Sequence, residues 1–229
     1  MPMPAPPPFP RAAIAAIAAI AAALSVYLGG LLYAGAVVGA ALPGYSHAGT
    51  PMAALALRGV PGAAWFNASL VAAGVLAAFA AASLRARLAP SAPWSARIGA
   101  RLLLLSALAF AAQGLLPLDP RDLDGPGAAL RGTAWTIWWP TLALGAALLA
   151  FGTRRAGPAA STALLWAGAL GFPAAALWSV GLLGPLPETA PHWPERLLPA
   201  AWMLWLCLLV WARGAAQEGK PLSAGRDTA

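Results

Sequence analysis

The side chains with the widest chemical range stand in three short segments between long apolar runs of this 229-residue chain. The first segment follows the first apolar run, the second follows the third, and the last precedes the final run. Together they hold Tyr45, Ser46, His47, Asp119, Arg121, His192, Glu195 and Arg196. We call these residues the outer-loop polar cluster and interpret them as the main candidate for chemistry in the sequence.

Two kinds of chemistry could be built here if the three segments converge. Ser46, His47 and Asp119 are the residue types of a hydrolase, in which imidazole takes a proton from serine and the carboxylate orients the imidazole. Adjacent serine and histidine rarely reach that geometry, so the sequence disfavours this trio. His47 and His192, together with the loop aspartates, could instead bind a metal ion.

A structural role explains the same residues more simply. We expect Asp119 to cap a turn, and we expect Arg121 or Arg196 to pair with a carboxylate. A surface of this kind fastens the connecting segments together without activating water. We therefore assign no catalytic residue, no metal site and no cofactor.

Composition defines the scaffold that must position this cluster. Apolar residues make up 60% of the chain and charged residues 9%, whereas soluble domains are about one-quarter charged. Six apolar runs approach or exceed the roughly 20 residues that a membrane-spanning helix needs. They cover residues 12–42, 63–84, 102–116, 133–151, 159–183 and 197–211. The third and sixth runs are short, and we expect both helices to extend a turn into their flanks. The sequence predicts an all-α fold, a polytopic membrane bundle of six transmembrane helices over residues 12–213. A proline-rich tail (1–11) precedes it and a disordered tail (214–229) follows.

The basic residues alternate between the two ends of this predicted bundle. Arg11, Arg85, Arg87, Arg97, Arg101, Arg154, Arg155, Arg213, Lys220 and Arg226 fall on the side of the termini, and Arg58, Arg121, Arg131 and Arg196 fall on the other. Lys and Arg near a span stay in the cytoplasm, so both termini are predicted to be cytoplasmic. The protein itself is predicted to lie in the inner (plasma) membrane. The net charge of +7 is then explained by anionic lipid headgroups rather than by nucleic acid.

The predicted span cores contain no Asp, Glu, Lys, Arg or His. Ionisable residues inside a membrane mark proton relays and ion-coupled transport. A transmembrane haem needs histidine ligands inside the bundle. The sequence therefore argues against a pump, a proton-coupled carrier and a two-histidine haem protein.

Uncharged polar and aromatic side chains within the spans allow two interpretations. Asn67 and Gln113, toward the predicted outer ends of their helices, either hydrogen-bond between helices or face a headgroup or polar ligand. Trp135, Trp138 and Trp139 share one helical face through their three- and four-residue spacing. They belong either to an aromatic belt at the membrane interface or to a shelf that holds a lipid tail or ring.

Two further patterns are typical of membrane bundles. The belt interpretation extends to four other tryptophans near the outer boundary, Trp65, Trp178, Trp193 and Trp202. Gly35 and Gly39 match the small-xxx-small pattern, which predicts that another helix approaches the first span closely.

Several of these segments also carry a family resemblance. Pro43-Gly-Tyr45-Ser46 follows the first run, Gly59-Val-Pro61 leads to Asn67, Gly114-Leu-Leu-Pro117-Leu-Asp119 closes the third run, and Glu195-Arg196 precedes the last. In their order and spacing, over most of residues 20–212, the chain resembles the domain-of-unknown-function 998 family of six-helix membrane proteins. That resemblance implies the fold and topology, and no activity.

The chain departs from the family pattern at two places. Family members often have an acidic residue near the position of Leu55-Ala56-Leu57 and a histidine near Arg131-Gly-Thr133. A site built on those groups would be lost in this member.

Two functional hypotheses follow from the sequence. In the first, the protein is a non-catalytic accessory or structural subunit that packs against partner helices or lipids, which predicts a filled core. In the second, it binds or modifies lipids in an outer-leaflet cavity lined by Asn67, Gln113, Trp135 and Trp139. An outer-face metal-dependent hydrolase is a third, weaker alternative. Membrane lipids are the expected partners, with other membrane subunits as further candidates.

Overall fold

Six long helices form the protein. The computed structural model describes residues 11–41, 44–154, 159–179, 181–184 and 192–218, with side chains as far as Arg213. The helices are α1 (Arg11–Ala41), α2 (Ala63–Ala86), α3 (Trp94–Leu115), α4 (Pro126–Thr153), α5 (Ala159–Ser179) and α6 (Trp193–Glu218), with a short 3-10 helix, η1 (Met52–Ala56), between α1 and α2. Each of the six is long and apolar enough to span a membrane, α6 through its Trp193–Arg213 part. The all-α, multi-pass prediction is confirmed at this level.

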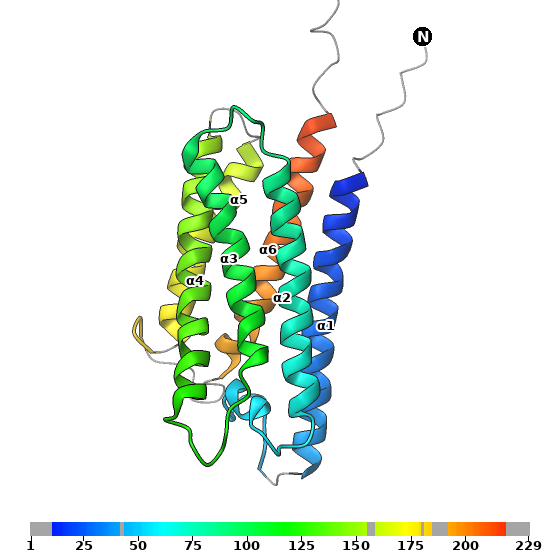
Figure 1. The fold of residues 1–229 in the computed structure, drawn as a ribbon, viewed down its shortest axis with the longest axis vertical. Coiled ribbons are helices and arrows are strands. Elements are labelled where there is room, and N and C mark those ends of the chain that lie inside the picture. Colours follow the sequence, from blue (N-terminus) through cyan, green and yellow to red (C-terminus); the bar gives the residue numbers. More distant parts are fainter. Residues whose placement is uncertain (1–10, 42–43, 155–158, 180, 185–191, 219–229) are drawn as a thin grey trace, which may run out of the picture.

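The helices form a closed ring. Each packs against the next in sequence, and α6 returns to pack against α1. Successive helices run in opposite directions, so α1 begins and α6 ends at the same end of the bundle (Figure 1). The opposite end is covered by residues 44–62, by residues 116–125 and by the start of α6 (Figure 1). We call it the capped end.

Glycines bring neighbouring helices together at several points of this ring. A Cβ added at Gly99 of α3 would lie 2.6 Å from the Leu149 backbone nitrogen of α4, and one added at Gly74 would lie 2.6 Å from Ala111. Close backbone approach of this kind is the packing mode expected where lipid replaces water. Gly35 and Gly39 do not lie at such a contact between helices, which corrects the sequence prediction. A Cβ at Gly35 would collide with the His47 ring, and one at Gly39 would lie 3.3 Å from the Tyr45 ring, so both glycines make room for a connecting segment rather than a helix.

Large aromatic rings fill the middle of the bundle. Tyr27, Phe110, Trp138 and Trp202 are at most 1% exposed. The Phe110 ring centroid lies 5.3 Å from Trp138 and 5.2 Å from Trp202. The aromatic-belt prediction is wrong for Trp138 and Trp202, because indoles at these positions face inward and pack against one another. Trp65, at 68% exposed, does lie on the surface.

Three helices begin before their apolar runs, as expected for α3 and α6, whose runs are short. Helix α3 starts at Trp94 instead of residue 102, α4 at Pro126 instead of 133, and α6 at Trp193 instead of 197. Proline is favoured in the first turn of a helix, where its missing N–H costs nothing, and Pro126 follows Gly125 in that position. The early starts place Arg97, Arg101, Arg131, Glu195 and Arg196 on helices. These residues lie in the first turns, outside the apolar runs that the prediction treats as span cores.

The predicted tails differ in how far the structure describes them. Helix α6 runs to Glu218, beyond the predicted end of the bundle at residue 213. Arg11 already belongs to α1. Residues 1–10 and 219–229 lie outside the described part of the chain.

Candidate ligand cavity at the capped end

The segment between α1 and α2 forms an ordered cover for the ring. Gly59 and Gly62 have φ of +82° and +83°, a left-handed conformation that glycine adopts without steric cost. They turn the chain after η1, where Leu57 pairs with Leu118 and the Arg58 N–H donates to the Leu118 carbonyl at 2.7 Å. The segments after α1 and α3 are thereby held side by side.

Arg131 fixes the start of α4 to two other helices. Its Nη1 donates to the Asn67 side-chain oxygen at 3.2 Å and to the carbonyls of Gln113 and Leu116 at 2.5 and 3.0 Å. The Asn67 amide in turn donates to the Ala56 carbonyl at 3.2 Å. Asn67 therefore hydrogen-bonds between helices, which is the first of the two interpretations given for it, and its partner is the buried Arg131.

Arg196 performs a similar task on the other side of the ring. It is 1% exposed, and its Nη2 donates to the Thr50 carbonyl at 2.7 Å while Nη1 donates to the His192 carbonyl at 3.2 Å. The Nη1 also lies 3.8 Å from Glu195 Oε1, which confirms the predicted arginine–carboxylate pair. The Tyr27 hydroxyl donates to the Arg196 carbonyl at 2.7 Å, linking this anchor to α1.

Glu195 joins α6 to η1. Its Oε1 accepts the Met52 backbone N–H at 2.5 Å and lies 3.2 Å from His192 Nδ1. The Glu195 carboxylate therefore accepts from a backbone N–H at the N-terminus of η1, where helical N–H groups otherwise lack partners.

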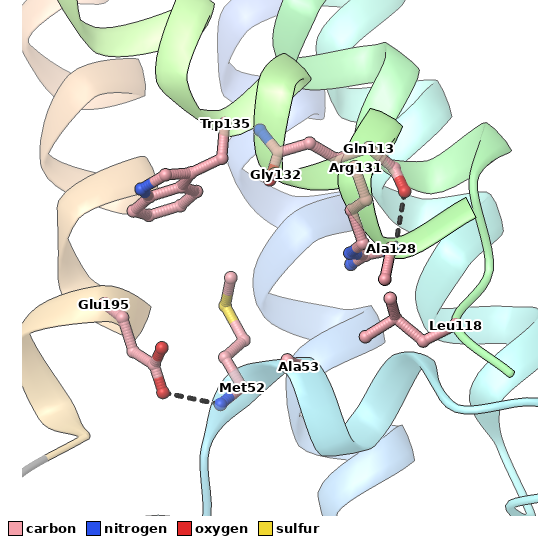
Figure 2. Close-up of a pocket in the computed structure, with 9 residues that line it drawn as sticks. All are labelled: Met52, Ala53, Gln113, Leu118, Ala128, Arg131, Gly132, Trp135 and Glu195. Atoms are coloured by element: carbon pink, nitrogen blue, oxygen red, sulfur yellow. Dashed lines mark hydrogen bonds between the residues drawn. The ribbon is translucent and has the colours of Figure 1, made fainter. Parts of the chain in front are cut away.

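A cavity of about 240 Å³ lies between these two anchors. Its lining is Met52, Ala53, Gln113, Leu118, Ala128, Arg131, Gly132, Trp135 and Glu195. Figure 2 shows Arg131 and Gln113 on one wall, Trp135 and Glu195 on the facing wall, and Met52 below. The Gln113 side chain is 2% exposed, yet its Nε2 has no hydrogen-bond partner among the described residues. Such a buried donor is rare in native proteins and calls for an acceptor.

Five members of the outer-loop polar cluster form two groups. His192, Glu195 and Arg196 contact residues 48–52, where the His192 N–H also donates to the Ala48 carbonyl at 3.1 Å. Tyr45 and His47 form their own pair, with the hydroxyl 3.3 Å from His47 Nδ1 and the rings in edge contact. Burial lowers the pKa of His47, and the positive charge of Arg196 lowers it further. A histidine in this setting is predominantly neutral near pH 7.

Ser46, Asp119 and Arg121 are engaged in their own segments. The Ser46 hydroxyl accepts the Gly49 N–H at 2.8 Å, and Asp119 Oδ1 accepts the Arg121 N–H at 2.9 Å. The turn-capping prediction for Asp119 is confirmed. No interaction found in the described part of the chain joins Ser46, His47 and Asp119, and no group of three or more His, Cys, Asp or Glu suited to a metal is found there.

The three tryptophans of α4 have different surroundings. Trp135 lines the cavity, Trp138 is fully buried in the aromatic core, and Trp139 is partly buried against that core. Only Trp135 can contact a molecule in the cavity. The shelf predicted from their spacing is thus reduced to a single indole.

Sequence reasoning missed Arg131 and Met52 as site residues. The fourth apolar run begins after Arg131, which predicts an outer-loop position for this residue. A signal was present in Gly125-Pro126, since proline at a first helical position would have started the helix before Arg131. No comparable signal marks Met52, whose place in the cavity depends on how η1 folds under the ring.

No protein-family model, characterised protein or solved structure matches this chain. The resemblance to the domain-of-unknown-function 998 family therefore stays a prediction from the motifs.

Proposed function

We propose that this protein is a non-catalytic multi-pass membrane protein that binds a small polar headgroup or solute in the capped-end cavity. The observation that carries the proposal is the pair of donors facing the cavity. Gln113 Nε2 lacks an acceptor, and no acceptor is found for Nη2 or Nε of Arg131 within the described residues. A ligand with acceptor oxygens would satisfy both groups.

The cavity also favours ligand binding over the accessory-subunit hypothesis. A purely structural subunit predicts a filled interior, and the middle of the bundle is filled by aromatic rings. The capped end instead combines an open space with converging polar groups, which is the usual make-up of a binding site. Its volume is below the range of drug-sized ligand pockets, about 300–1,000 Å³, and suits a headgroup or a compact solute.

We further propose that the capped end faces outward. The distribution of basic residues supports this orientation, because the end opposite the cap carries Arg85, Arg87, Arg97, Arg101 and Arg154. A ligand would then enter from the outer leaflet or the space beyond it.

Filling the cavity tests the proposal. Gly132 lines it, and a Cβ at Gly132 meets nothing within 4 Å. We expect Gly132→Leu to fold, because leucine favours helix over glycine by about 0.5–1 kcal/mol, and to occupy the cavity. Thermal unfolding in detergent should show that a polar lipid extract or a deproteinised solute extract of the host cells stabilises the wild type and not this variant.

Gly127→Leu is the matched control. Gly127 lies on the same helix, outside the cavity lining, with the same open surroundings. It should respond to the extracts as the wild type does. Equal stabilisation of Gly132→Leu and the wild type, or no stabilisation of the wild type by either extract, would refute the proposed function.

A further inference from the structure

We infer that the cavity selects a zwitterionic group, with its anionic part at Arg131 and Gln113 and its ammonium part at Glu195 and Trp135. The inference rests on the proposed function and adds the chemical class of the ligand. It follows from the opposite charges on the two facing walls (Figure 2).

The first wall is cationic and incompletely paired. The three acceptors of Arg131 are an amide oxygen and two backbone carbonyls, all uncharged. Within the described residues, no carboxylate lies in ion-pair distance of Arg131, which is 7% exposed. A buried charge without a counter-ion is costly. A phosphate or carboxylate would neutralise it and could accept from Arg131 and Gln113 together, because a guanidinium presents several donors in a fixed plane.

Glu195 gives the facing wall a negative pole. Its Oε1 carries the contacts to Met52, His192 and Arg196. In the part of the chain that the structure describes, no donor is found for Oε2. Glu195 lines the cavity while its neighbour Arg196 does not, so the cavity meets the carboxylate rather than that cation.

Trp135 makes the same wall suitable for an ammonium group. Its indole lies on the Glu195 side of the cavity (Figure 2). Indole faces attract cations electrostatically, most strongly where water is excluded. An ammonium group placed here meets a carboxylate oxygen and an aromatic face, while the anionic part of the same ligand reaches the opposite wall.

The same chemistry occurs in two sources, a lipid headgroup of the phosphoethanolamine type and a free solute such as phosphoethanolamine itself. Binding of both can be measured on the full chain in detergent micelles by titration calorimetry. The probes are dihexanoyl phosphatidylethanolamine, dihexanoyl phosphatidylglycerol and O-phosphoethanolamine. We expect the ethanolamine lipid to bind about tenfold more tightly than the glycerol lipid, the size of effect that one charge-assisted contact supplies. If O-phosphoethanolamine displaces the ethanolamine lipid at a concentration similar to that of the lipid, the natural ligand is a free solute. If it does not displace the lipid, the natural ligand is the lipid headgroup.

Glu195→Gln isolates the ammonium contact. The amide oxygen of Gln can still accept the Met52 N–H, so η1 keeps its anchor. We expect the tenfold preference to disappear because binding of the ethanolamine lipid weakens while binding of the glycerol lipid does not. Should this variant not fold, Trp135→Leu tests the same wall and should reduce the preference in the same direction.

The outcomes separate this inference from the proposed function. Equal affinity for the two lipids in the wild type, or an unchanged preference in both variants, overturns the zwitterion assignment. If Gly132→Leu still abolishes binding in that case, the cavity is a ligand site of another class. Absence of binding by all three probes, with extract stabilisation intact, likewise overturns the assignment and leaves the proposed function standing.

Discussion

At the scale of single residues, two buried arginines organise the capped end. Arg131 and Arg196 each donate to backbone carbonyls from segments far away in sequence. A guanidinium can serve several acceptors at once because its donors are fixed in one plane. The connecting segments thus acquire defined positions without any extensive hydrophobic core of their own.

Arg196→Met should destabilise the fold by about 1–3 kcal/mol, the cost of leaving buried carbonyl partners unsatisfied. The Thr50 and His192 carbonyls would lose their donors. Thermal unfolding of the purified protein measures the loss. Arg196→Lys should lose an intermediate amount of stability, since the charge remains but a single ammonium group replaces the several donors of the guanidinium. Wild-type stability in Arg196→Met would contradict the anchoring role.

The surroundings of His47 predict a pH dependence. Its folded pKa lies below the ordinary value of 6.5, so the unfolded chain binds more protons between the two values. Stability is therefore fully present above about pH 6.5 and falls as the pH drops toward the folded pKa. Unfolding temperatures measured from about pH 8 to about pH 5 should decrease less for His47→Gln than for the wild type. Identical pH profiles would show that His47 makes no contribution, because His192 is retained in both proteins.

At the scale of helices, glycine positions decide which pairs can touch. Gly99 and Gly145 face each other across α3 and α4, and a Cβ at Gly99 would lie 2.7 Å from the Gly145 carbonyl oxygen. Backbone atoms cannot move aside as a flexible side chain can. The α3–α4 contact therefore depends on the absence of a side chain at these points.

Gly99→Ala should cost about 1–3 kcal/mol through overpacking, despite the higher helix propensity of alanine. Gly171→Ala is the matched control, since Gly171 also lies within a helix and a Cβ there meets nothing within 4 Å. That control should be neutral or more stable. Retention of folded protein after heating in detergent compares the two variants, and an equal response of both would contradict the close-packing argument.

At the scale of the whole molecule, the closed ring places the residues that line the cavity at one end. Successive helices run in opposite directions, so α1, α3 and α5 all end toward the capped end (Figure 1). This arrangement explains how residues from positions 52, 113, 131 and 195 line one cavity.

The proposed orientation has a direct test. Because basic residues near spans stay in the cytoplasm, alkaline phosphatase fused after Asp122 should be active, and the same enzyme fused after Arg155 should be inactive. The phosphatase activity of each fusion, divided by the amount of fusion protein expressed, is compared between the two. The reverse pattern would place the capped end and its cavity in the cytoplasm.

The sequence by itself determined the number of helices, their membrane-spanning character and the end at which the polar segments gather. Each of these properties is local. A span is defined by about 20 consecutive apolar residues, and the side of a loop follows from counting spans. The turn at Asp119 was likewise predictable, since an aspartate bonds its own backbone two residues on.

Only the tertiary structure decided which polar residues meet. The sequence predicts that Arg131, which precedes an apolar run, lies in a loop. A buried arginine is acceptable only when acceptors from other segments surround it. Those acceptors, at Asn67, Gln113 and Leu116, are distant in sequence. Neighbouring segments likewise decide why Trp138 is buried in the core while Trp135 lines the cavity, although both lie on α4. Burial is a property of the neighbours that the ring supplies, and no single helix specifies them.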